Sequence, residues 1–389
     1  NIQLINVPGL SVLGPNGTFR TVITPLNPTN LTPPFFQVWD QRFLDILGPK
    51  PRVRVIAERD DFEFAHEVFV LYHQAPIWDP IEDQIFFASA NSPVCPSPFL
   101  QSESTDELTL NRNNEVFVIK LKDVKDIPGP QNITWTKVRI PITPDIQVVN
   151  GGTPFGNNLL FVTNGRGNSP PGVSLVNPRP PFNSTTILDN FHGRQFNSLD
   201  DVRVHPKSGA VFFTDTTCAF RYGFLGAFRP PPLLPNQVYR FDPRTREVHV
   251  VADGFIIPNG ITFSPDGNIA YVSDTGGLQA NIFNSTRPTT LYSFDVDPTT
   301  QRFLNRRTFA WADTGIPDGF QVDSKGNVYA SCGDGVQVYD PSGILLGKIF
   351  TGSISANNVF AGKGRMVVMV ETKIVLVEFA AEGSLVELK

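Results

Sequence analysis

Cysteine and methionine are scarce in this chain, which has only three cysteines and two methionines among 389 residues. Three cysteines form at most one internal disulfide, so disulfide bonds do not build the fold. Basic residues form no cluster and the formal net charge is −5, which argues against a nucleic-acid partner. The chain also has no run of about 18 apolar residues, so the sequence offers no candidate for a helix that crosses a membrane.

Turn-forming residues, in contrast, are abundant. The chain has 31 glycines, 35 prolines and 32 phenylalanines, with 40% hydrophobic and 18% charged residues. This balance is typical of a globular chain rather than a disordered one. Segments with helical periodicity are nearly absent, so the composition predicts an all-β protein.

A short apolar strand recurs six times along the chain. The copies read "QIFFASAN" at 84, "NLLFVTNG" at 158, "AVFFTDT" at 210, "IAYVSDT" at 269, "NVYASCGD" at 327 and "RMVVMVET" at 365. Each copy follows a turn and another apolar strand, and more strand-like sequence comes behind the pairs. Six units of four strands each predict a six-bladed β-propeller.

The ends of the repeat suggest how the ring closes. "PRVRVIAE" at 51–58 precedes the first unit and is expected to pair with the short last unit, which would leave few bare strand edges. Residues 1–50, rich in proline and asparagine, are expected to form an arm over the surface. Residues 51–389 would then be a single propeller domain. The alternative fold is a β-sandwich or a pair of barrels, which does not account for the polar residues described next.

The first strand of each unit opens on a carboxylate or an amide. These residues are Glu67, Asn150, Asp200, Asn259, Asp318 and Asn357. The innermost strands of a propeller line a central channel, so the six side chains are expected to converge at one end of it. Carboxylates placed so close together repel one another unless a cation lies among them. An all-oxygen set suits a hard cation, and Ca²⁺ tolerates irregular geometry better than Mg²⁺.

The alternative reading of these residues is structural. Asn and Asp before Gly are ordinary turn residues, so a single such dipeptide would favour a turn; the six equivalent positions favour a metal site. No zinc motif is present, because His66 and His73 are spaced too far apart for HExxH. Asp215 and Asp274, which end two of the second strands, are expected to cap loops rather than bind the cation.

Other features point to secretion. The chain starts at Asn1 rather than at Met, which predicts the removal of a secretory segment. Five glycosylation sequons support this expectation, at Asn16, Asn30, Asn132, Asn183 and Asn284. Cys95 and Cys218 each come just past an innermost strand, at the same end of the channel, so we expect a disulfide between them. Cys332 would remain a buried free thiol.

Three segments together resemble a known family. "VVADGFIIPNGITFSPDGNIAYVSDTG", "GRQFNSLDDVRVHPKSGAVFFTDT" and "IPDGFQVDSKGNVYASCGDGVQVYDPSG" resemble the regucalcin/gluconolactonase family of calcium-dependent six-bladed propellers. The similarity is greater to the secreted fungal lactonohydrolases, which open aldonate and pantoyl lactones. It runs from about residue 36 almost to the C-terminus.

The resemblance implies roles for particular residues. The metal-binding Glu of the family falls on Glu67 in "HEVFV", its Asn on Asn259 in "PNG", and its Asp on Asp318 in "PDG". Asp318 would also be the favoured general base. A further inner Asn, usually in "ND", falls on Asp200 in "LDDV", which is a departure from the family. The added carboxylate would tighten Ca²⁺ binding, or would itself serve as the base.

Four further residues are candidates for substrate binding: His66, Asn150, Arg194 and Asn357. Two of them have plain structural alternatives, because His66 could be hydrogen-bonded behind the ligands and Arg194 could be an exposed loop residue. No GxSxG motif, P-loop or dinucleotide fingerprint offers another catalytic set.

The reaction that the resemblance implies is hydrolysis of sugar-type (aldono-) or related lactones. Ca²⁺ would polarise the carbonyl, and Asp318 or Asp200 would act as base or as nucleophile. Two alternatives stay open: an aryl-ester or phosphotriester hydrolase of paraoxonase type, and a non-catalytic propeller that binds Ca²⁺ or sugar. A monomer acting on a small molecule is the default expectation.

Overall fold

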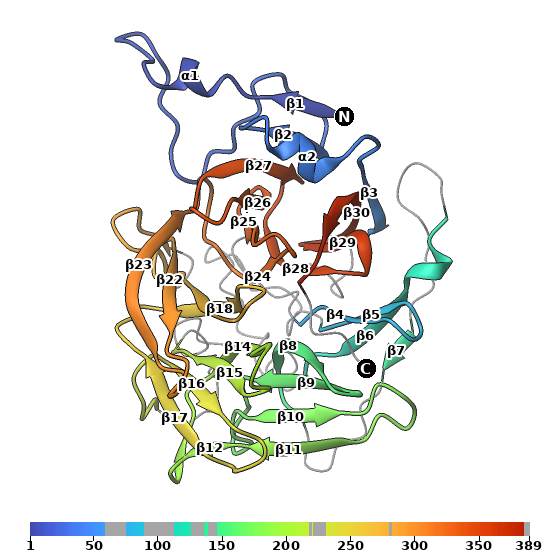
Figure 1. Ribbon diagram of the computed structural model, residues 1–389, viewed down its shortest axis with the longest axis vertical. Helices are drawn as coiled ribbons and strands as arrows, with labels where there is room; N and C mark the ends of the chain where they lie inside the picture. The colour runs from blue at the N-terminus through green and yellow to red at the C-terminus, as the bar shows by residue number, and fades with distance from the viewer. Residues whose placement is uncertain are drawn as a thin grey trace, which may run out of the picture.

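A computed structural model describes residues 1–58, 75–88, 113–125, 136–138, 146–217, 220, 231–279 and 282–384. Nearly all regular structure in these residues is β, and the main sheets stand as six blades around a central axis (Figure 1). The predicted six-bladed β-propeller is confirmed. Among the described residues, no helix is long and apolar enough to cross a membrane.

The first four blades each consist of a four-stranded antiparallel sheet. Blade 1 contains β4 (Ile77–Asp79), β5 (Gln84–Ala88), β6 (Val116–Lys120) and β7 (Thr136–Val138). Blade 2 contains β8 (Val149–Phe155), β9 (Asn158–Thr163), β10 (Val173–Val176) and β11 (Ser184–Leu188). Blade 3 contains β14 (Leu199–Val204), β15 (Val211–Asp215), β16 (Gln237–Phe241) and β17 (Val248–Ala252). Blade 4 contains β18 (Pro258–Phe263), β19 (Ile269–Asp274), β22 (Thr290–Val296) and β23 (Phe303–Trp311).

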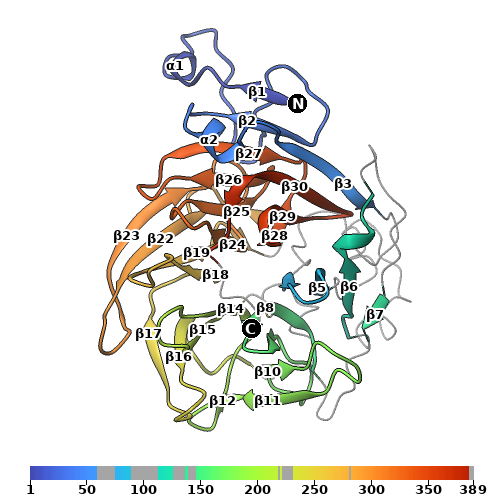
Figure 2. The ribbon, with the colours of Figure 1, turned by 45° about the vertical axis from the view of Figure 1, so that its right-hand side comes forward.

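Blade 5 is extended by the N-terminal segment. Its own strands are β24 (Phe320–Val322), β25 (Val328–Cys332), β26 (Gly335–Tyr339) and β27 (Leu345–Phe350). The strand β2 (Phe35–Val38) pairs antiparallel with β27, and β1 (Ile2–Leu4) pairs parallel with β2. Residues 1–50, expected to form an arm over the surface, therefore add two strands to this blade (Figure 2). They also contain the short helices α1 (Val7–Leu10) and α2 (Phe43–Leu47).

Blade 6 closes the ring with strands from both ends of the propeller. It contains β28 (Ser355–Phe360), β29 (Lys363–Val370), β30 (Lys373–Glu382) and β3 (Arg52–Glu58). The strand β3 pairs antiparallel with β30, with Val53 opposite Val377. The predicted closure by residues 51–58 is confirmed. The smaller elements are the pairs β12 (Asn190–Phe191) with β13 (Arg194–Gln195) and β20 (Leu278–Gln279) with β21 (Ile282–Phe283), and the 3₁₀ turn Leu121–Asp123.

The core of the protein lies between the blades. Each of the six apolar clusters found among the described residues joins two neighbouring blades. This follows from the alternation of side chains along a strand, since adjacent residues point to opposite faces of the sheet. In β15, Phe212 packs toward blade 4 and Phe213 toward blade 2. Nearly continuous apolar strands are thus required, as the repeat showed.

The six innermost strands surround the channel. In chain order they are β4, β8, β14, β18, β24 and β28; each contacts the next, and β28 contacts β4. The predicted opening of the first unit, at Glu67, lies outside the described residues. The described inner strand of blade 1 is β4, which begins at Ile77 and pairs with β5. Three strand residues suffice there because Ile77 to Asp79 all find partners in β5.

Candidate functional site

Three of the predicted ring residues occupy the same place in a repeated β-bulge. The pairing of the inner strand with its neighbour shifts register between Val149 and Gly152, between Leu199 and Val202, and between Pro258 and Ile261. The residue just after the start of each strand is Asn150, Asp200 or Asn259. A bulge changes the direction of a side chain locally, and here it does so at the same end of the channel in blades 2, 3 and 4.

Glycines show how closely the inner strands approach at this level. A Cβ atom on Gly151 would lie 2.4 Å from the carbonyl oxygen of Asp200, and one on Gly260 would lie 2.4 Å from that of Asp318. Real Cβ atoms do not come so near a backbone oxygen, so glycine is required after Asn150 and after Asn259. The strands of adjacent blades thereby place their polar residues side by side.

Two carboxylates and an amide form the centre of the site. Asn150 Nδ2 donates a hydrogen bond of 2.9 Å to Asp200 Oδ1, and both Asp200 and Asp318 are buried. Burial raises the pKa of Asp200 well above its usual range, and the negative charges of Asp318 and Asp201 raise this pKa further. The repulsion between Asp200 and Asp318 means that the two share one low-dielectric region.

Hydroxyl groups on the second strands hold the ring in place. Thr214 Oγ1 donates to the backbone oxygen of Asn259 at 2.7 Å, and Ser273 Oγ donates to that of Asp318 at 3.2 Å. The same hydroxyls accept hydrogen bonds from the backbone of their own blades, at Asp201 and Gly260. Each hydroxyl therefore joins one bulge to the ring residue of the next blade. This explains why Thr or Ser recurs in "FFTD" and "YVSD".

The carboxylates that end those two motifs hold the loops leading into the inner strands. Asp215 accepts from the backbone N–H groups of Asn197 and Ser198. Asp274 accepts from those of Ile256, Ile257 and Gly276 at 2.9 to 3.0 Å. The prediction that Asp215 and Asp274 cap loops is confirmed.

Asn357 takes a different place from the one predicted. Blade 6 has its register shift between Ser355 and Asn357, and Ala356 supplies the carbonyl oxygen that accepts from Gly319 N. Asn357 Oδ1 accepts from the backbone N–H of the next residue at 2.9 Å, as Asp201 Oδ1 does in blade 3 at 2.8 Å. Asn357 thus matches Asp201 rather than Asp200. The bulges of blades 3 and 6 have the same length, so the residue equivalent to Asp200 in blade 6 is Ala356.

Several other predicted residues do not join this cluster or lie outside the described part of the chain. Arg194 is exposed in the hairpin β12–β13, where the neighbouring Phe191 packs against Tyr239 of the third strand of the blade. The described residues exclude His66, Glu67, Cys95, Cys218 and Asn132. Cys332 is a buried free thiol, as predicted, and burial raises its pKa well above the usual range.

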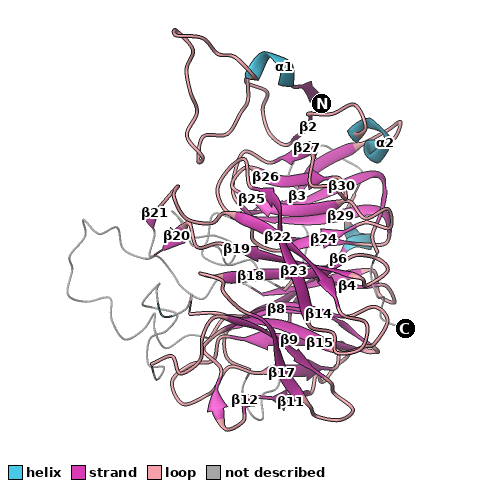
Figure 3. Ribbon diagram, turned by 60° about the vertical axis from the view of Figure 1, so that its left-hand side comes forward, coloured by secondary structure: helices cyan, strands magenta, loops and turns pink. Residues whose placement is uncertain are grey.

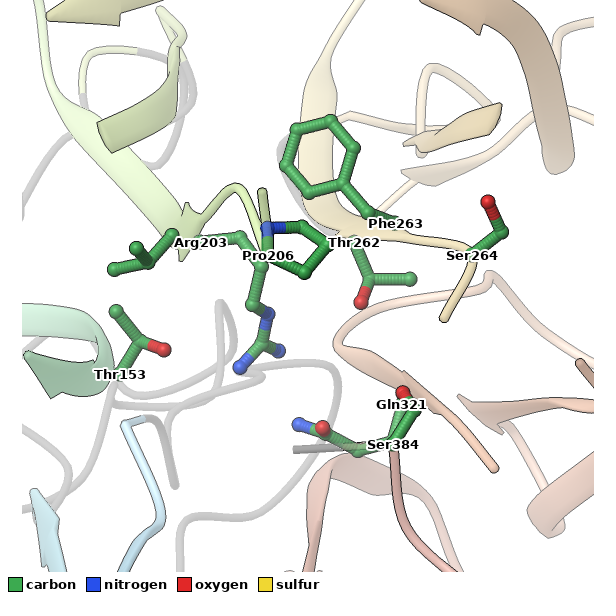
Figure 4. A pocket seen from close by; sticks show the side chains of 9 residues that line it. Thr153, Arg203, Pro206, Thr262, Phe263, Ser264, Gln321 and Ser384 are labelled. Carbon is green, nitrogen blue, oxygen red and sulfur yellow. The ribbon is translucent and has the colours of Figure 1, made fainter. Parts of the chain in front are cut away.

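The sequence reading missed a buried arginine in the channel. Arg203 lies three residues after Asp200, and the corresponding residues of blades 2, 4 and 5 are Thr153, Thr262 and Gln321. The Arg203 guanidinium points into the space between these side chains, in a cavity of about 40 Å³ (Figure 4). The sequence did carry a signal for this residue, because Arg203 occupies an inner-strand position at which the other blades have smaller polar residues.

The Arg203 side chain links blade 3 to blades 4 and 5 through hydrogen bonds. Its Nε donates to the backbone oxygen of Ile261 at 3.2 Å, and its Nη2 donates to that of Phe320 at 3.3 Å. Asp201, which accepts from the backbone of Ile261, lies 4.0 Å from the guanidinium. Burial lowers the pKa of Arg203, and the charge of Asp201 opposes this effect. The guanidinium therefore lies inside the channel, next to the cavity lined by Thr153, Thr262 and Gln321.

The ring residues have the chemistry of a site for a hard cation. Among the residues that the structure describes, no three His, Cys, Asp or Glu side chains form a metal cluster. The ring instead combines two carboxylates, Asp200 and Asp318, with the amides of Asn150 and Asn259. Carboxylate and amide oxygens are the donors that Ca²⁺ takes. A divalent ion here would offset the repulsion that raises the pKa of Asp200, so the donor set fits.

Several known proteins are similar to this chain in sequence or in fold. Lactonohydrolase oryL of Aspergillus oryzae is 29% identical over 91% of this chain and 77% of its own. Lactonohydrolase oryH of the same species is 37% identical over 84% of this chain and 76% of its own. Among solved structures, a gluconolactonase from Xanthomonas campestris matches 92% of this chain and 98% of its own, with a TM-score of 0.66 and 22% identity. A calcium-binding regucalcin from Agrobacterium tumefaciens matches 86% of this chain and 98% of its own, with a TM-score of 0.53 and 16% identity.

A family model agrees with these relatives. The SMP-30/gluconolactonase/LRE-like region matches residues 171–372, which contain Asp200, Asn259 and Asp318. The match covers 202 of the 389 residues (372 − 171 + 1). Together with the 37% identity to a lactonohydrolase, it shows that this chain belongs to the SMP-30/gluconolactonase/LRE-like family.

Proposed function

We propose that this protein is a calcium-dependent hydrolase of aldono-type or related lactones. The observation that carries the proposal is the pair of buried carboxylates, Asp200 and Asp318, next to the amides of Asn150 and Asn259 at one end of the channel. The names of the relatives support lactone hydrolysis, since two are lactonohydrolases and one neighbour in structure is a gluconolactonase. The calcium-binding regucalcin supports the choice of ion.

The ring residues would hold the cation through their side-chain oxygens. A bound Ca²⁺ would supply polarisation of the lactone carbonyl and a counter-charge for the developing oxyanion. Asn150 would orient Asp200 through the hydrogen bond between them. Glu67 stays a predicted further ligand, outside the described residues, and its neighbour His66 a predicted substrate contact.

A carboxylate of the ring would move the proton. Water attacks the lactone carbonyl carbon while Asp318 accepts a proton from it, the ring C–O bond breaks, and the same proton passes to the departing alkoxide oxygen. Burial of Asp318 keeps bulk water away from this transfer. Asp200 is the second candidate for the base, because it is a buried carboxylate next to Asp318.

The alternative chemistry is attack by the carboxylate itself, which forms an acyl-enzyme that water then cleaves. A single turnover in ¹⁸O-water separates the two routes. Label that enters the carboxylate of Asp318 or Asp200 contradicts direct attack by water. Label found only in the hydroxy-acid product supports it.

Variants of the two carboxylates test the proposed activity. Asp318→Asn is expected to lower kcat on glucono-1,5-lactone by about 10²-fold or more, since it removes the proton acceptor. Asp297→Asn is the matched control, because Asp297 is a partly exposed turn residue that accepts hydrogen bonds from Thr299 and Thr300. Faster hydrolysis of an aryl acetate than of any lactone would favour the aryl-ester alternative. An equal loss of kcat in Asp318→Asn and Asp297→Asn would contradict the role of Asp318.

We further propose that the protein is secreted and glycosylated. The four sequon asparagines within the described residues, Asn16, Asn30, Asn183 and Asn284, are all exposed. In the last of them, Asn284 Oδ1 accepts from Thr286 of the same sequon at 2.7 Å. Digestion of the natively expressed protein with an N-glycosidase should lower its mass, and unreduced peptides should link Cys95 to Cys218. An unchanged mass, or a link to Cys332, would contradict these proposals.

A further inference from the structure

A small apolar pocket lies beside the ring of polar residues. We call it the mouth pocket; its side chains come from Ile23, Leu278, Phe283, Ile316 and Ile354, and Gly315 and Gly333 complete the lining. It has a volume of about 30 Å³, and none of the described side chains that line it is polar. By the size of a water molecule, that volume takes roughly two small groups such as methyls.

The pocket opens close to Asp318. The backbone from Thr314 to Asp318 runs beside residues 331–333, since Asp318 N donates to Ser331 O and Gly333 N donates to Thr314 O, both at 2.9 Å. Ile316 is two residues before Asp318 in this segment. Two residues span at most about 7 Å of chain, so the backbone of the pocket wall lies within roughly 7 Å of the Asp318 backbone. A small substrate held at the ring can therefore reach the pocket.

The N-terminal segment supplies one wall. The backbone oxygen of Val22 accepts from Gly315 N at 3.0 Å. Arg20 pairs with Asp313 at 2.7 Å and donates to the backbone oxygen of Thr24 at 3.1 Å. These contacts hold the segment that contains Ile23 against residues 313–315. In Figure 3 the loop that follows α1 and the hairpin β20–β21, which carries Leu278 and Phe283, extend over the same side of the propeller.

Asp313, which pairs with Arg20 of the N-terminal segment, has a second basic partner. Asp313 also contacts the buried ammonium of Lys348 at 2.6 Å. Burial acts to raise the pKa of Asp313, but Arg20 and Lys348 outweigh it and lower this pKa. Asp313 therefore stays ionised at neutral pH and holds the N-terminal segment against the loop that leads to Asp318.

We infer that the mouth pocket receives an apolar substituent of the lactone, so that the preferred substrates carry a short alkyl group rather than hydroxyls at every ring carbon. The inference rests on the proposed lactone hydrolysis. Polar ring residues would take the ester group, and an apolar group would gain by leaving water for the pocket, about 0.8 kcal/mol per buried CH₂. Ile23, distant in sequence from the ring, then contributes to substrate choice.

The test compares δ-valerolactone, which has no substituent, with its alkyl-substituted relatives δ-hexalactone and δ-octalactone. Wild-type protein is expected to have a higher kcat/KM on the substituted lactones. Ile23→Asp should lower kcat/KM on the substituted lactones by about tenfold and leave δ-valerolactone within about twofold. Leu4→Asp is the matched control, because Leu4 is an exposed apolar residue of the same segment (63% against 48% for Ile23) that does not line the pocket.

Three outcomes would overturn the inference. Equal rates on all three lactones in the wild type would show that no apolar group is recognised. Equal losses on all lactones in Ile23→Asp would assign the residue a general structural role. No turnover of any lactone by the calcium-loaded protein would refute the proposed function as well, which distinguishes that failure from the first two.

Discussion

Replacement of the buried arginine tests how the channel is held together. In Arg203→Met the side chain keeps most of its length but loses its charge and its hydrogen-bond donors. The backbone oxygens of Ile261 and Phe320, on two further blades, then lose their partners. Asp201 loses its nearby positive charge but keeps the N–H groups of Val202 and Ile261.

The magnitude follows from these contacts. Each buried carbonyl left without a donor costs about 1–3 kcal/mol, so two cost about 2–6 kcal/mol. The methionine side chain recovers about 1 kcal/mol through apolar packing. A net loss near 3 kcal/mol is expected. For a chain of 389 residues the unfolding entropy is about 0.8 kcal/mol/K, so the melting temperature should fall by about 4 °C.

Differential scanning calorimetry measures this fall, with Arg244→Met as the control. The Arg244 side chain is 78% exposed, and its replacement should change stability by less than about 0.5 kcal/mol. Arg203 also opposes a cation at the ring by charge, so Arg203→Met should bind Ca²⁺ more tightly in calorimetric titration. A melting temperature within 1 °C of wild type, or weaker Ca²⁺ binding, would refute this account of the channel.

Three further predictions follow from single residues. Asp200→Asn should weaken Ca²⁺ binding yet stabilise the metal-free protein, because it removes a like charge beside Asp318; lower stability in EGTA would contradict this. Burial lowers the pKa of His205 below its usual value of 6.5; its contribution to stability is therefore complete above pH 6.5 and is lost as the pH falls toward the folded pKa, by at most about 1.4 kcal/mol per pH unit. Urea unfolding from pH 7.5 to 5.5 should show a flatter pH profile of stability for His205→Gln than for the wild type; identical profiles would contradict this. Asp274→Asn should cost about 2–4 kcal/mol in urea unfolding, because three backbone N–H groups lose a charged acceptor; a cost below 1 kcal/mol would contradict the loop-holding role.

The repeat made the fold predictable. Apolar alternation and the turn residues identified the strand pairs, and residues 51–58 could be assigned to the last blade because an unpaired edge would otherwise remain. Asp215 and Asp274 were identified as loop caps because they end buried strands. These features depend on local pattern, which the sequence carries in full.

Features that depend on register or on distant contacts were not predictable in the same way. Asn357 was placed in the ring, but the pairing of blade 6 aligns Asn357 with Asp201 and Ala356 with Asp200. Residues 1–50 show no strand repeat, yet β2 finds the free edge of β27. The role of Arg203 could not be predicted from its own strand, because its hydrogen-bond partners lie on two other blades.

The most direct test of the central claim is proton release by the purified protein on glucono-1,5-lactone and pantoyl lactone, before and after EGTA, with Ca²⁺ then restored. The account predicts activity that disappears with EGTA and returns with Ca²⁺, because the ring of Asn150, Asp200, Asn259 and Asp318 acts together with the ion. Activity that persists fully after EGTA treatment, or no activity on either lactone while Ca²⁺ remains bound, would contradict it.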